Sequence, residues 1–67
     1  MKNRVRELRK QHNLTQQELA DNVSVSSRTI IPLENQKYNP SVLLAYKIAL
    51  IFNLSIEEVF IFDEIDK

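Results

Sequence analysis

The sequence lacks cysteine and glycine, and it has a single histidine, His12. Without cysteine there is no disulfide, no thiol nucleophile and no thiolate metal site, and one histidine alone builds neither a zinc site nor a catalytic triad. Without glycine, each turn that needs a positive φ must use asparagine or accept strain. The sequence therefore predicts no enzyme activity, no metal site, no cofactor and no pocket for a small-molecule ligand.

Long apolar runs are also missing. The longest, residues 42–52, contains Lys47 and is far shorter than the roughly 20 residues that span a bilayer. The start of the chain has no apolar segment of the signal-peptide type. We expect no membrane partner and a cytoplasmic setting. The 67 residues fit one domain, 1–67, and a core of this size contributes only about 3–5 kcal/mol, which favours oligomerisation.

Neither sign of charge is in excess, since nine lysines and arginines face nine aspartates and glutamates. The charges are nevertheless unevenly placed. Residues 1–40 hold seven basic and four acidic residues, whereas residues 41–67 hold two basic and five acidic ones. The two parts therefore carry net charges of +3 and −3. From charge alone, an ordinary solvated surface and a basic surface that faces an anionic partner fit equally well.

Helix-start signals recur along the chain. Thr15 and Ser55 are each followed three residues later by glutamate, the capping-box pattern, and Ser26 and Ser41 are further cap residues. With the apolar periodicity, these signals predict five short helices at about 3–11, 15–22, 26–35, 41–52 and 55–60. Short connections between them are typical of a compact all-α bundle. Residues 59–62 are β-branched and aromatic, so a short C-terminal β element is also compatible with the sequence.

The helices predicted at 15–22 and 26–35 are joined by only three residues, so they must cross steeply. Core positions of this pair carry small or apolar residues: Leu19, Ala20, Val23, Val25, Ile30 and Leu33. The outward side of the second helix, near its N-terminus, is left with Ser27, Arg28 and Ile31. In a DNA major groove, arginine can read guanine bidentately and isoleucine can contact a thymine methyl. We predict these three residues as base contacts.

Three runs of the sequence resemble one family: Leu14-Thr15-Gln16-Gln17-Glu18-Leu19-Ala20, Val25-Ser26-Ser27-Arg28-Thr29-Ile30 and Glu34-Asn35-Gln36-Lys37-Tyr38-Asn39-Pro40-Ser41. They are similar to the XRE, or Cro/lambda-repressor-like, helix-turn-helix transcriptional regulators. The resemblance covers about residues 3–60. It implies a five-helix DNA-binding fold with the motif at about 15–35 and a dimerisation region at about 42–67. It also implies a homodimeric regulator, a repressor that binds a palindromic site on double-stranded DNA.

The resemblance further implies residue roles. Ser27 and Arg28 match the base-reading pair. The matches to DNA-backbone contacts are Gln16, Ser26, Thr29, Lys37, Tyr38 and Asn39. Arg4 and Lys10 flank the first predicted helix and are added as phosphate contacts because of their charge. Arg9 and Glu34 match a pair that forms a structural salt bridge in some members, so Arg9 is not counted as a DNA contact.

Three positions depart from the family's pattern. Ser24 and Gln36 stand where glycine is usual, and a left-handed conformation at Gln36, or at Asn35 in its place, costs of order 1 kcal/mol. Pro32 lies inside the helix predicted at 26–35, which would read the bases. Its ring removes the hydrogen bond to the carbonyl of Arg28, and this costs roughly 3 kcal/mol of helix stability. We expect either a kink after the first turn and a half of this helix or a separate turn formed by residues 33–35.

The helix predicted at 41–52 is apolar on all sides, so it must be covered on all sides. Its core-facing residues are predicted to be Leu44, Ala45, Ile48, Ala49 and Phe52. Its other apolar side chains need a second protomer. With the apolar C-terminal residues, to which Ile65 also belongs, they give the predicted dimer interface: Leu43, Tyr46, Leu50, Ile51, Ile61 and Phe62.

Two rival functions stay open. One is an antitoxin-like interaction module whose main activity is to bind a partner protein. The other is a degenerate helix-turn-helix domain in which Pro32 has abolished base reading.

Overall fold

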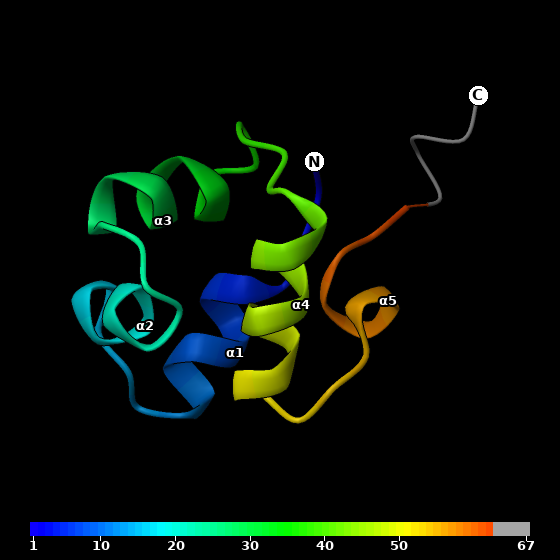
Figure 1. Ribbon diagram of the computed structural model, residues 1–67. Coiled ribbons are helices and arrows are strands. Elements are labelled where there is room, and N and C mark those ends of the chain that lie inside the picture. The colour runs from blue at the N-terminus through cyan, green and yellow to red at the C-terminus, as the bar shows by residue number, and fades with distance from the viewer. Residues whose placement is uncertain (63–67) are drawn as a thin grey trace.

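The computed structural model describes residues 1–62, and these fold into five helices. They are α1 (Val5–Gln11), α2 (Gln16–Asn22), α3 (Ser27–Glu34), α4 (Val42–Ile51) and α5 (Ile56–Val59) (Figure 1). The predicted all-α, five-helix architecture is confirmed. The observed helices are shorter than the predicted ranges mainly because those ranges included the flanking cap residues. The prediction for Ile65 lies outside the described residues.

Three of the four predicted caps form as expected. Thr15 and Ser55 each take part in a complete capping box, and the Ser41 hydroxyl accepts a hydrogen bond from the backbone N–H of Leu44 at 3.1 Å. Ser26 occupies the N-cap position of α3, but its side chain makes no capping hydrogen bond. The cap prediction is therefore correct for the position of Ser26 and wrong for the bond.

The capping box of α5 changes the acidity of Glu58. The backbone N–H and the hydroxyl of Ser55 lower the pKa of the Glu58 carboxyl, and Arg4 lowers it further by charge. A carboxyl whose pKa is depressed by folding stabilises the folded state above its ordinary pKa of 4.5. That contribution is lost as the pH falls through the lower pKa of the folded state.

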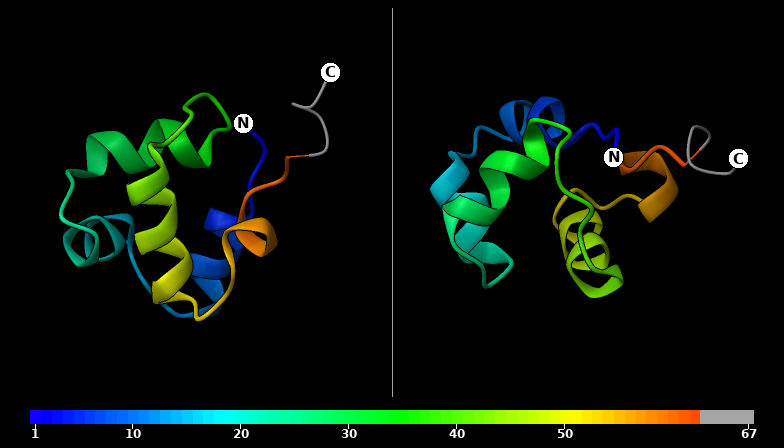
Figure 2. Two further views of the ribbon diagram at one scale, coloured as in Figure 1. Left: turned by 45° about the vertical axis from the view of Figure 1, so that its right-hand side comes forward. Right: turned by 90° about the horizontal axis from the view of Figure 1, so that it is seen from above.

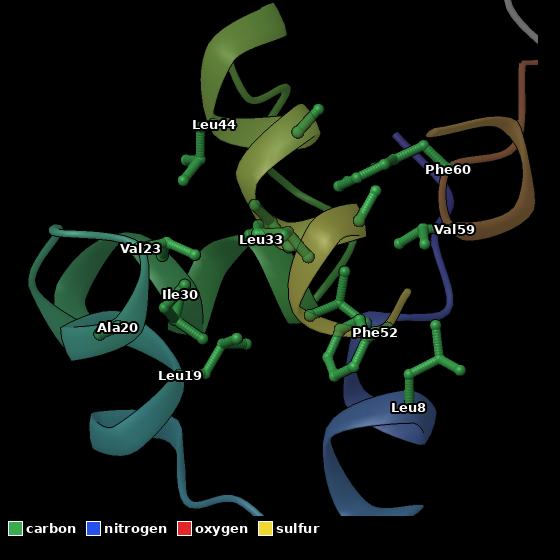
Figure 3. Packing of buried hydrophobic residues seen from close by; sticks show 14 residues of the cluster. Leu8, Leu19, Ala20, Val23, Ile30, Leu33, Leu44, Phe52, Val59 and Phe60 are labelled. Carbon is green, nitrogen blue, oxygen red and sulfur yellow. The ribbon is translucent and has the colours of Figure 1, made fainter. Parts of the chain in front are cut away.

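Within the described residues, the helices enclose one apolar core (Figure 3). Leu19, Ile30 and Leu33 are fully buried where α2 and α3 cross, and Phe60 closes the core at the C-terminal side. All the residues of the fourth helix predicted to face inward are buried: Leu44, Ala45, Ile48, Ala49 and Phe52. The helical period alone thus assigned the correct side of α4 to the core.

The C-terminal segment pairs with the N-terminal segment as a single antiparallel bridge between Asn3 and Phe60. The N–H of Arg4 donates to the carbonyl of Val59 at 2.8 Å, and the N–H of Ile61 donates to the carbonyl of Lys2 at 2.9 Å. The predicted β element is thus reduced to this bridge within the described residues. Figure 2 shows the two segments side by side, beyond α4.

Among residues 1–62, four turns use a positive φ without glycine, at Asn13, Ser24, Gln36 and Asn53. Asparagine tolerates this conformation best among residues with a Cβ, whereas serine and glutamine are strained. Ser24 has φ of 62° and Gln36 has φ of 64°, as expected from their places in the family's pattern. Gln36 is compensated by its side chain, which bonds to the backbone of Asn3.

We expect Ser24→Gly to stabilise the protein by up to about 1 kcal/mol, because glycine adopts this conformation without a Cβ clash. For a domain of this size each kcal/mol raises Tm by roughly 4–8 °C. Gln36→Gly should gain less or lose stability, since it also removes the bonds to Asn3. Thermal unfolding followed by circular dichroism measures both. A Tm for Ser24→Gly below that of the parent protein contradicts the assignment of strain.

Candidate nucleic-acid interface

Helix α3 lies along one edge of the molecule, and its N-terminal turn is far from α5 (Figures 1 and 2). Ile30 and Leu33 are fully buried and attach the helix to the core. Arg28 is exposed, and Ile31 is 42% exposed. Ser27 is half-buried beside them. The predicted outward residues are thus gathered in the first turns of α3.

Pro32 does not end α3, which continues as one helix to Glu34. The separate turn considered for residues 33–35 is therefore not formed. Beyond Pro32 the backbone N–H of Lys37 donates to the Pro32 carbonyl at 3.0 Å, and that of Gln36 donates to the Leu33 carbonyl at 3.1 Å. These two bonds close the C-terminal end of α3.

A buried carboxylate fixes α3 relative to the two preceding helices. Glu34 is only 2% exposed, and its Oε2 accepts from Nε of Arg9 at 2.6 Å while its Oε1 accepts from Nη2 of Arg9 at 3.2 Å. The same guanidinium donates to the carbonyl of Leu14 at 2.8 Å. The Arg9–Glu34 pair that the resemblance implied is therefore present, and Arg9 has a structural role.

Gln16, predicted as a phosphate contact, takes part in this cluster. Its Nε2 donates to Oε1 of Glu34 at 3.2 Å, and the side chain is half-buried. Its backbone lies in the first turn of α2, where N–H groups have no helical partner. Arg6 adds a longer ion pair to Glu34 at 3.6 Å and donates to Asn35 Oδ1 at 2.6 Å. The amino-acid pattern gave no signal for this second arginine.

Apart from Lys2, the lysine and arginine side chains of residues 1–62 fall into two groups. Arg6 and Arg9 are held by Glu34, and Arg4 is held by Glu7 at 3.3 Å and by the carbonyl of Glu58 at 3.1 Å. The guanidinium of Arg4 therefore lies against α5, where Glu58 is located. In the part of the chain that the structure describes, the side chains of Lys10, Arg28, Lys37 and Lys47 make no hydrogen bond or ion pair.

The loop after α3 leaves the helix along the same edge of the molecule (Figure 1). Lys37, Tyr38 and Asn39 are all exposed in it. Thr29, in the first turns of α3, is half-buried, and Ser26, before the helix, is exposed. The structure thereby brings most of the predicted DNA-contacting residues to α3, its N-cap and the loop that follows it.

An apolar surface, which we call the α4 face, consists of Val42, Leu43, Tyr46 and Leu50. Val42 is 80% exposed and Leu43 62%, and the other two are more than half exposed. Val42 was not among the predicted interface residues, although its spacing of four from Tyr46 and eight from Leu50 is a helical signal. Ile51 and Ile61, predicted there as well, are half-buried, and Phe62 is exposed.

A hollow of about 270 Å³ borders the α4 face. Val42 belongs to both, and Phe62 forms another part of the wall of the hollow. The remaining lining is almost entirely apolar and comes from Met1, Pro40, Ala45, Ile56 and Phe60. Apolar residues of α4 and of the C-terminal segment thus form a continuous surface separate from the first turns of α3.

Residues 1–62 contain neither a metal-ligand cluster nor a membrane-spanning helix. No group of three or more histidine, cysteine, aspartate or glutamate side chains lies close enough together to hold a metal ion. No helix in this part of the chain combines the length and apolar character needed to cross a membrane.

Comparison with known proteins gives consistent matches. A family model described as helix-turn-helix matches residues 5–59. An uncharacterized HTH-type transcriptional regulator of Archaeoglobus fulgidus is 56% identical over 64 residues, which cover 96% of this chain and 90% of the relative. One from Methanocaldococcus jannaschii is 48% identical over 64 residues, covering 96% and 97%.

Solved structures agree with this fold. The restriction-modification controller protein C.AhdI from Aeromonas hydrophila matches with a TM-score of 0.75 and 27% identity, covering 82% of this chain and 83% of that one. A chain of the SinR protein/SinI protein complex also matches with a TM-score of 0.75, at 24% identity, over 81% of this chain and 53% of that one. At that identity the second match bears on the fold alone. The predicted lambda-repressor-like fold is confirmed.

Proposed function

The chain belongs to the XRE-type helix-turn-helix family, and we propose that it is a transcriptional regulator that binds double-stranded DNA as a homodimer. The observation that carries this proposal is that the side chain of Arg28 is exposed and unpaired among residues 1–62. Of the four arginines, the other three are engaged by carboxylates or carbonyls, whereas Arg28 stands exposed in the first turn of α3 without a partner among residues 1–62. An arginine in this place suits bidentate contact with guanine.

In this proposal the first turns of α3 enter the major groove, where Ser27, Arg28 and Ile31 contact bases. The surrounding DNA backbone is contacted by Gln16, Ser26, Thr29, Lys37, Tyr38, Asn39 and Lys10. Arg4 would have to leave Glu7 and the carbonyl of Glu58 to join them. Phosphate contacts set the register of the protein on the duplex, whereas the base contacts provide the specificity.

Pro32 is compatible with base reading. Ser27 and Arg28 precede it by five and four residues, and α3 is continuous across it. The first turn of the helix, which would enter the groove, is therefore formed without the missing N–H of Pro32. This supports a reading function over the degenerate domain considered from the sequence.

The α4 face supports a homodimer. Exposed apolar patches on a small protein mark interaction sites, and a core of this size gains stability from a second copy. A two-fold axis near α4 would place two copies of α3 roughly 34 Å apart, one turn of B-DNA, so the bound site would be palindromic. Such a dimer would act as a repressor by excluding polymerase from the site it occupies.

A second candidate function, binding of a different protein, is favoured by the same exposed face. Sedimentation equilibrium at micromolar concentration distinguishes the two. A mass of two chains supports the homodimer, whereas a mass near 7.9 kDa leaves the face for another partner.

The experiment that tests DNA binding is selection from a random duplex library, followed by titrations at several salt concentrations. We expect enrichment of a palindromic sequence and a slope of log K against log salt of about −0.9 for each phosphate neutralised. No enrichment, with equal affinity for all sequences, would contradict the proposal.

A further inference from the structure

The C-terminal end of α3 is held from outside the helix. Pro32 has no N–H to donate to the carbonyl of Arg28, so the second half of α3 has fewer internal hydrogen bonds than a helix of its length normally has. The N-terminal segment supplies others. Nδ2 of Asn3 donates to the carbonyl of Leu33 at 2.9 Å, and the backbone N–H of Asn3 donates to Oε1 of Gln36 at 2.7 Å.

Gln36 completes this link in the opposite direction. Its Nε2 donates to the carbonyl of Asn3 at 3.3 Å and to that of Glu34 at 3.3 Å. The side chain of a residue in the left-handed conformation thus ties two backbone segments that are 33 residues apart. No periodic or compositional signal in the sequence indicated this contact.

Asn3 is itself fixed on its other sides. Its Oδ1 accepts the backbone N–H of Val5 at 3.0 Å at the start of α1. Its backbone forms the bridge with Phe60, and the neighbouring Lys2 accepts from the N–H of Ile61. Asn3 is therefore bound to α1 and to the C-terminal segment, and its bond to Leu33 fixes the end of α3 relative to both.

Gln36 directly precedes the loop of Lys37, Tyr38 and Asn39. We propose that Asn3 is a positioning residue for DNA binding, which holds the end of α3 and the start of this loop through its bonds to Leu33 and Gln36. This inference rests on the proposed function. The segment that anchors Asn3 also carries Ile61 and Phe62, so the DNA-binding edge and the proposed dimer surface share one anchor.

The informative variant is Asn3→Asp. Aspartate keeps the acceptor for the N–H of Val5, loses the donor to the carbonyl of Leu33, and adds one negative charge. Asn22→Asp is the matched control, because Nδ2 of Asn22 donates to the carbonyl of Glu18 at 2.9 Å inside α2. Asn22→Asp loses one amide-to-carbonyl bond, whereas Asn3→Asp also loses a longer one to the carbonyl of Met1 at 3.4 Å. The two variants change the net charge equally, but only Asn3→Asp releases the end of α3.

The probes are the duplex that the parent protein selects from a random library and a scrambled duplex of the same composition. We expect the affinity of Asn3→Asp for the selected duplex to be about tenfold below that of Asn22→Asp. Without the bond from Asn3, the end of α3 and the following loop are held less firmly in the conformation that binds DNA. Their affinities for the scrambled duplex should agree. Amide hydrogen exchange at Gln36 and Lys37 should accelerate in Asn3→Asp only.

A second, uncharged pair keeps the test decisive if Asn3→Asp unfolds. Gln36→Met cuts the same link from the side of α3, and Gln17→Met removes a comparable bond, to Asp21 Oδ1 at 2.8 Å, within α2. The ratio of selected to scrambled affinity should fall for Gln36→Met and stay unchanged for Gln17→Met.

Two results overturn the inference in distinguishable ways. If the parent protein selects a duplex and the folded Asn3 and Gln36 variants keep the affinity ratio of their controls, Asn3 has no positioning role. If the parent protein selects no duplex, the proposed function fails and the inference fails with it.

Discussion

Arg9→Met is expected to unfold most of the protein at 25 °C. The change leaves Glu34, only 2% exposed, without its bidentate partner at 2.6 and 3.2 Å, and it also removes the bond to the carbonyl of Leu14. Breaking a buried ion pair in this way costs about 3–5 kcal/mol. A domain of this size has about that much stability from its core. Urea unfolding followed by circular dichroism measures the loss.

Arg6→Met is the matched control. It removes the same charge and an ion pair to the same carboxylate, but the distance is 3.6 Å and the Arg6 side chain is 50% exposed. Such a pair contributes at most about 1 kcal/mol. The double variant Arg9→Met/Glu34→Met should recover much of the stability, because no buried charge is left unpaired. Equal losses for the two arginines would contradict the assigned role of Arg9.

Leu50→Glu is expected to convert the protein to a monomer and to lower its affinity for the selected duplex by about 10²–10⁴-fold. Leu50 is 56% exposed in the α4 face, so a carboxylate there is tolerated by the isolated chain. In a dimer it would be buried against apolar side chains. A monomer loses the second half-site, and with it the gain from joining two binding events.

Gln11→Glu, at the exposed end of α1, adds the same negative charge at a residue that is not part of the α4 face, and it serves as the control. Sedimentation equilibrium should give a mass of two chains for this variant and of one chain for Leu50→Glu. If Leu50→Glu keeps the mass of the parent dimer, the interface lies elsewhere.

The elements that the sequence predicted well are those set by local, repeating rules. Thr15, Ser41 and Ser55 marked helix starts because a hydroxyl needs only the next few backbone N–H groups to act as a cap. Leu44 and Ile48 were assigned to the core because a helical period brings them to one face. The left-handed conformation at Gln36 was predicted because Gln36 stands at a position where the family usually has glycine.

The parts that it missed depend on contacts between distant residues. Asn3 and Gln36 meet across 33 positions, and the alternative interpretation of each as a solvated polar residue fits the sequence equally well. Arg4 and Arg6 are the same residue type two positions apart, so the sequence does not distinguish them. In the structure Arg6 forms an ion pair with Glu34, whereas Arg4 donates a hydrogen bond to a carbonyl of α5. At Ser26 the cap position was correct, but the side chain makes no capping bond.

The most direct test of DNA reading by α3 compares Arg28→Ala with Lys37→Ala on the selected duplex and on single-base-pair variants of it. Both changes remove one positive charge. We expect Arg28→Ala to lose about 1–3 kcal/mol on the selected duplex and to relax the preference at one base pair. Lys37→Ala should weaken binding to all the duplexes alike and reduce the salt slope by about 1. If Arg28→Ala keeps the full sequence preference of the parent protein, α3 does not read bases through Arg28.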